Sequence, residues 1–247
     1  ICLYDNAGEH FEATATNPIV TQHMAHSSGL FFVFDPLQEP MFLRNLYGKS
    51  KDPQVSLYCS ERIVEQERVR LTPQHTVLAT ANSNIKNYLG NHGNQPLDTP
   101  LFIIAAKHDA WDFMLDGELS SFFREGNPYS QNPVDKIAAL RTNLLEETSK
   151  KLRNLFIEYC PQLVATAEQL SRNVYYIPVS ATGTPPHSSH EYCRAGSAPE
   201  PNTDKPKFYF RSGDLQPSWA EVPLLWMLSK HVGGLVPFER PLTEAVA

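Results

Sequence analysis

Three apolar runs without polar alternation constrain the fold of this chain more than any other feature. They lie at residues 29–34, 100–106 and 173–179 and are rich in aromatic, β-branched and other apolar side chains. Such a run predicts a strand that is covered on both faces, as in a parallel sheet, because a half-exposed strand alternates apolar with polar residues. A shorter run at residues 1–4 predicts another strand of the same kind.

Helical patterns separate these strands. The strongest covers residues 132–159, where apolar side chains recur at three- and four-residue steps, Asn132 can cap the first turn and Pro133 suits the first helical position. Apolar strands that alternate with helices predict an α/β fold, a three-layer, mainly parallel, doubly wound sheet. The other expected elements are helices at residues 72–89 and 162–170, a short strand at 207–211 and a final helix at 218–232 capped by Ser218.

Composition and charge narrow the classes of partner. The 247 residues are 41% hydrophobic and carry a formal net charge of −6, which gives no electrostatic reason to expect nucleic acid as a partner. No apolar run approaches the ~20 residues of a membrane-spanning helix, so no membrane span is expected. The four cysteines lie far apart without a C-x-x-C pair, a pattern typical of reduced thiols, and we therefore expect a cytoplasmic protein.

Polar signatures follow three of the predicted strands. Asp5 and Gly8 come after the first run, Lys107 and Asp109 after the run at residues 100–106, and a Ser180-Ala181 pair after the last run. Ligands of doubly wound sheets bind at the carboxyl ends of the strands. An Asp at such an end can hold hydrated Mg²⁺, and a nearby Gly lets a backbone N–H approach a phosphate oxygen.

These signatures, in this order, resemble the last three nucleotide-contacting motifs of the Ras-like GTPases, D-x-x-G, N-K-x-D and S-A. This is the TRAFAC class of P-loop GTPases, which includes bacterial GTPase-like domains, and residues 31–34 match a core strand of that family. The resemblance covers residues 1–247 as a single GTPase-like domain, with insertions at about 38–99 and 184–205. It implies a sheet of the P-loop GTPase type.

The resemblance also implies a role for each motif residue. Asp5 would hold Mg²⁺ through water, and the Gly8 amide would meet the γ-phosphate of GTP. Asp109 would accept the two N–H groups on the pyrimidine edge of guanine, which adenine does not offer. The stem of Lys107 would lie along the base and sugar. At the Ser180-Ala181 motif, the Ala181 amide would donate to guanine O6.

Three departures from the family pattern limit what the resemblance implies. The P-loop, G-x-x-x-x-G-K-[ST], is absent, and we expect the natural protein to continue upstream of Ile1 and to carry it there. Ala106 replaces the Asn of the N-K-x-D motif. Glu9 replaces the Gln that orients the attacking water, and His10 could take that role as a neutral imidazole. Slow or absent hydrolysis is therefore expected.

Two hypotheses about function remain open from the sequence. The first is a guanine-nucleotide-binding switch that takes GTP and GDP with Mg²⁺ and acts on a protein partner or on further domains of the same protein. The second is a pseudo-GTPase, a scaffold or interaction module of the same fold that binds no nucleotide. An intact P-loop upstream would favour the switch, and a degenerate one would favour the scaffold.

Two histidine groups have the residue types of metal sites. His187, His190 and Cys193 are spaced as zinc ligands can be, but they lack a second ligand pair and lie in a Pro- and Ser-rich loop. His23 and His26 lie one helical turn apart. A metal role is not expected for either group.

Overall fold

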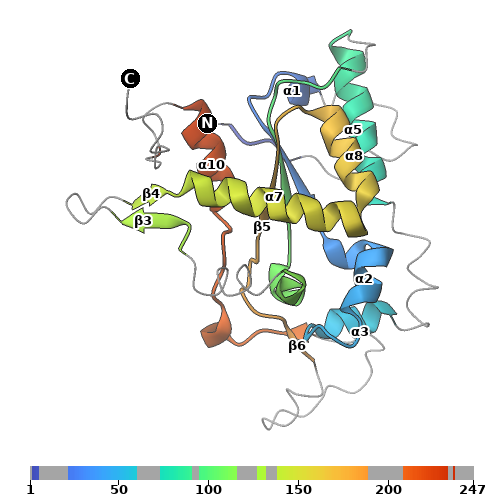
Figure 1. Ribbon diagram of the computed structural model, residues 1–247, viewed down its shortest axis with the longest axis vertical. Helices are drawn as coiled ribbons and strands as arrows, with labels where there is room; N and C mark the ends of the chain where they lie inside the picture. Colours follow the sequence, from blue (N-terminus) through green and yellow to red (C-terminus); the bar gives the residue numbers. More distant parts are fainter. Residues whose placement is uncertain are drawn as a thin grey trace.

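A three-stranded parallel sheet lies at the centre of the computed structural model (Figure 1). Its strands are β1 (Leu30–Phe34), β2 (Leu101–Ala105) and β5 (Val174–Pro178), and β2 pairs with both of the others. The three long apolar runs are thus confirmed as strands of one parallel sheet. The structure describes residues 2–5, 22–59, 73–90, 95–115, 127–131, 138–188, 208–232 and 236.

Seven α-helices, four short 3-10 helices and two short antiparallel strand pairs complete the described part of the fold. The fold is therefore mixed α/β. The helices are α1 (Gln22–Ala25), α2 (Pro40–Leu46), α3 (Pro53–Cys59), α5 (Gln74–Tyr88), α7 (Thr142–Tyr159), α8 (Pro161–Leu170) and α10 (Val222–His231). The short strands are β3 (Tyr129–Gln131) with β4 (Ala138–Leu140), and β6 (His187–Ser188) with β7 (Phe208–Tyr209).

Helices cover both faces of the sheet. On one face Phe156 of α7 packs its ring 5.9 Å from that of Tyr176 in β5. On the other face Trp226 of α10 lies 4.7 Å from the ring of Tyr175. Neighbouring residues of a strand point to opposite faces, so α7 and α10 lie on opposite sides of β5. This explains why the strand has no polar alternation.

The predicted strand at residues 1–4 is wrong in its described part. Residues 2–5 form no strand, and the side chains of Leu3 and Tyr4 are 64% and 66% exposed. The ring of Tyr4 instead stacks on that of His23 in α1, at 4.5 Å between centroids. A four-residue apolar run forms a strand only where a neighbouring strand takes its N–H and C=O groups, and no described strand lies against this one.

The predicted start of the long helix is also wrong. Helix α7 begins at Thr142, while residues 138–140 form β4 and pair with β3. Asn132 and Pro133 lie outside the described residues. Leu140 is fully buried although it lies in β4 and not in the helix. The helical spacing of apolar residues therefore continues from α7 back into the strand, and the sequence does not show where the helix begins.

The remaining helix and strand predictions had mixed outcomes. Helices α5 and α8 confirm the expectations at residues 72–89 and 162–170, and β7 confirms the short strand within 207–211. Ser218 does not cap α10. Its backbone pairs with that of Ser180 in both directions, at 2.8 and 3.0 Å, and α10 begins four residues later. Helices α2 and α3 were not expected, although each has a proline at its start.

No helix in the described ranges combines the length and the apolar character that crossing a membrane requires.

Candidate functional site

Polar residues from all three sheet strands meet at the carboxyl edge of the sheet. Asp35 follows β1, Lys107 and Asp109 follow β2, and Ser180 follows β5. The hydroxyl of Ser180 donates a hydrogen bond to the Asp109 carboxylate. The sequence predicts Asp5, Asp109 and Ser180 along one edge of the sheet; this is confirmed for Asp109 and Ser180 and wrong for Asp5.

The turn that starts at Ser180 is held tightly in place. The Gly183 N–H donates to Ser180 Oγ at 2.7 Å, and the Gln216 N–H donates to Thr182 O at 2.9 Å. Gly183 has φ +69°, and a Cβ there would lie 1.8 Å from Gln216 O. Only glycine fits this position. Ala181 lies exposed within the same turn.

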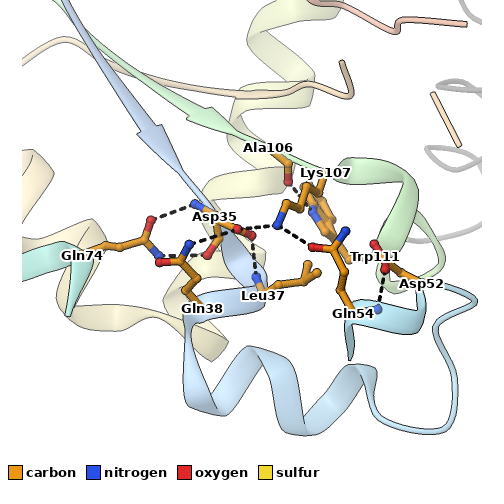
Figure 2. Close-up of polar contacts among 9 residues, drawn as sticks. All are labelled: Asp35, Leu37, Gln38, Asp52, Gln54, Gln74, Ala106, Lys107 and Trp111. Carbon is orange, nitrogen blue, oxygen red and sulfur yellow. Dashed lines mark hydrogen bonds and ion pairs between the residues drawn. The ribbon is translucent and has the colours of Figure 1, made fainter. Parts of the chain in front are cut away.

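Lys107 is fixed at both its backbone and its side chain (Figure 2). Its backbone is left-handed, with φ 54°, and its ammonium lies 2.8 Å from Asp35 Oδ2 and 3.1 Å from Gln54 Oε1. Burial alone would lower the pKa of Lys107, but the charge and hydrogen bond of Asp35 raise it above its ordinary value. The ammonium therefore faces β1 and α3.

The segment between α2 and α3 is tied to the loop that carries Asp109. The Ser50 hydroxyl donates to Ala110 O at 2.7 Å, and Asp52 Oδ1 accepts the N–H of Gln54 at 2.8 Å. Asp52 is only 2% exposed. The pKa of the Asp52 carboxyl is raised to about 6, chiefly by burial; the hydrogen bond from Gln54 and the charge of Lys107 oppose this rise, and the charge of Asp109 adds to it.

A cleft of about 730 Å³ opens beside the carboxyl edge. Lys49 and Lys51 bring positive charge to its wall from the segment between α2 and α3. His108 is buried, and that burial lowers its pKa, which favours the neutral imidazole. Other lining residues are Asp109, Asp112, Phe113, Gly183, Gln216 and Trp219.

The structure does not bring the remaining motif residues to this edge. Asp5 follows Tyr4, whose ring stacks on His23 of α1. Helix α1 leads into the amino end of β1 (Figure 1), which is the end of the sheet opposite to Asp109. Gly8, Glu9 and His10 lie outside the described residues.

The predicted metal site finds no support in the described part of the chain. Within it, no three His, Cys, Asp or Glu side chains are grouped so that they could hold a metal ion. The Asp5 carboxylate lies away from the cleft, so the described residues do not fit the Mg²⁺ role that the resemblance implied. His187 Nε2 lies 3.3 Å from Asp214 Oδ2, and His190 and Cys193 lie outside the described residues.

Sequence reasoning missed three polar side chains of this site, those of Asp35, Asp52 and Gln54. Asp35 carried the same signal as Lys107 and Ser180, since it directly follows an apolar run. Asp52 precedes Pro53, a pair that is typical of a helix start. The position of Gln54 near Lys107 has no signal in the sequence, because the two residues meet only through the fold.

The arrangement is suited to binding a ligand with paired N–H donors. The Asp109 carboxylate lies at the wall of the cleft, and an ionised carboxylate can accept about four hydrogen bonds, of which Ser180 supplies one. The chain matches no model of a protein family, no curated protein and no solved structure. The identity of the ligand must therefore be inferred from the site itself.

Proposed function

We propose that this chain is a guanine-nucleotide-binding switch domain of the Ras-like GTPase type. The observation that carries the proposal is the placement of Asp109, which follows β2, lies at the wall of the cleft and is held by Ser180 from the end of β5. Both residues belong to motifs that resemble those of the family. A doubly wound sheet of the P-loop type is part of this proposal, and the helices on both faces of β5 support it.

Guanine fits this site better than adenine for a chemical reason. Its pyrimidine edge offers two N–H donors side by side, which a carboxylate can accept together, whereas adenine has an acceptor at the ring nitrogen of that edge. A buried acceptor left without donors costs about 1–3 kcal/mol or more, which corresponds to roughly 10–10²-fold in affinity. Asp109 therefore sets the base preference.

Hydrolysis and metal binding remain predictions. Glu9 and His10 lie outside the described residues, and the position of Asp5 beside α1 does not support its proposed role with Mg²⁺. The described residues support recognition of the nucleotide base, through Asp109 and Ser180.

The pseudo-GTPase scaffold is the second candidate, and Ala106 is the residue that favours it. The Ala106 methyl group makes no hydrogen bond. Its backbone N–H donates to Phe34 O at 2.8 Å, and its carbonyl accepts from Trp111 Nε1 at 2.9 Å. The loop is thus held by Trp111 without the Asn of the family motif. A domain that binds no nucleotide could keep this contact.

Calorimetric titration of the full-length protein with GDP, ADP and XDP tests the proposal. The wild type should prefer GDP to ADP by about 10²-fold. The substitution Asp109→Asn should weaken GDP binding and favour XDP, whose extra carbonyl accepts from the amide. Asp112→Asn is the matched control, because Asp112 lines the same cleft, and it should leave the base preference unchanged. Equal affinity for GDP and ADP, or no binding of either, would contradict the proposal and favour the scaffold.

A further inference from the structure

Asp35, at the carboxyl edge, is held by polar contacts of both its side chain and its backbone (Figure 2). Its Oδ1 accepts the N–H of Leu37 at 3.0 Å, and its Oδ2 accepts from Gln38 Nε2 at 3.3 Å and from Lys107 Nζ at 2.8 Å. Its backbone N–H and C=O bond the side-chain amide of Gln74 at 2.8 and 2.9 Å. Both the carboxylate and the backbone of Asp35 are therefore held in place.

This fixed carboxylate determines where the Lys107 side chain points. A lysine side chain that is free to move loses conformational entropy when it is ordered. Asp35 and Gln54 order Lys107 through contacts within the protein, so a bound nucleotide need not do so. They also direct the ammonium toward β1, while Asp109, two residues along the chain, borders the cleft.

We propose that Asp35 is a positioning residue of the nucleotide site, which acts through Lys107. By holding the ammonium at the end of β1, it keeps Lys107 from pairing with the Asp109 carboxylate and leaves that carboxylate for the base. This role rests on the proposed function. It extends the site to a residue that touches no nucleotide, and through Gln74 it connects the site to the first turn of α5.

A double-mutant cycle in the full-length protein separates this role from a merely structural one. Asp35→Asn keeps an oxygen that can accept from Leu37 but removes the charge that holds Lys107. We expect it to weaken binding of fluorescent methylanthraniloyl-GDP by about tenfold, which corresponds to about 1.4 kcal/mol. The reason is that Lys107 is then no longer ordered and can pair with the Asp109 carboxylate. In a Lys107→Met background the same change should have no effect, because the residue through which it acts is gone.

Gln38→Ala is the matched control. It removes the other side-chain donor to Asp35 Oδ2 and leaves Lys107 in place, so GDP binding should change less than twofold. Thermal unfolding of every variant shows whether the fold is kept. An effect of Asp35→Asn that persists with Lys107→Met, or an unchanged affinity, would overturn the positioning role while the proposed function stands.

A measurement without nucleotide tests the contact itself. Acetic anhydride modifies neutral amines, so its rate of reaction at Lys107, relative to that at Lys49 in the same chain, reports how strongly the ammonium is held. Asp35→Asn should raise this ratio severalfold, because the charge and hydrogen bond of Asp35 that raise the pKa of Lys107 are then lost. An unchanged ratio would overturn the inference on its own. If the wild type binds no GDP, the proposed function fails and the positioning role fails with it.

Discussion

Replacement of Asp52 by asparagine should stabilise the protein at neutral and alkaline pH. The carboxyl of Asp52 is almost fully buried, and its pKa is about 6 compared with 3.8 for an unperturbed group, chiefly because burial disfavours the charged form. A difference of about 2 pKa units corresponds to roughly 3 kcal/mol of free energy of unfolding. Asparagine stays neutral and can still accept the N–H of Gln54, which Asp52 Oδ1 bonds at the start of α3.

The sign of the pH dependence follows from the direction of this shift. The folded protein binds the Asp52 proton more tightly than the unfolded chain, so the stability that the group contributes is complete below pH ~4 and is lost as the pH rises through ~6. The Asn variant should therefore unfold with a free energy higher than that of the wild type by up to ~3 kcal/mol at pH 8. At pH 4 the difference should shrink to about 0.5 kcal/mol.

Urea unfolding at pH 4, 6 and 8 measures this difference. Tryptophan fluorescence is a suitable probe because Trp111, Trp219 and Trp226 are all buried. Asp98→Asn is the control, since the Asp98 side chain is 83% exposed, and its effect should stay within about 0.5 kcal/mol at each pH. A loss of stability in the Asp52 variant at pH 8, or a gain of equal size at all three pH values, would refute the reasoning.

Two further pairs of variants test packing that positions the site. Gly183→Ala should destabilise the fold by more than ~2 kcal/mol in thermal unfolding, because its Cβ would collide with Gln216 O, whereas Gly48→Ala, at a similar φ of +72° but in open space, should cost about 1 kcal/mol. Phe156→Ala should lower the free energy of unfolding by about 3–5 kcal/mol because the ring is fully buried, and the same change at the neighbouring, half-exposed Ile157 should cost less than about 1 kcal/mol. Equal losses within either pair would contradict the packing described here.

The central sheet could be predicted because its signal is local. Each of its strands is one continuous apolar run, and burial on both faces follows from the run itself. The pairing of β3 with β4, and that of Ser180 with Ser218, joins segments whose sequences carry no such pattern. The exposed run at residues 2–4 shows the limit of this local signal, because an apolar run does not form a strand without a neighbouring strand to pair with.

The candidate site was predictable to the same limited extent. Asp109 and Ser180 follow predicted strands, and parallel strands end at one edge, so their meeting could be expected. The raised pKa of Asp52 could not be predicted, because it depends on how the segment between α2 and α3 packs against the loop that carries Asp109. The orientation of Lys107 likewise depends on two side chains that lie more than fifty residues away.

The bond between Gln74 and Asp35 limits how far the sheet can grow beyond β1. The Phe34 carbonyl accepts from Ala106 on the β2 side, so the N–H and C=O of Asp35 point to the outer edge, where the Gln74 amide takes both. In this respect the side chain takes the place of one residue of a neighbouring strand, and the described part of the chain has no strand on this side of β1. A strand added at this edge can pair with Val33 but not with Asp35, unless Gln74 leaves and the first turn of α5 moves with it.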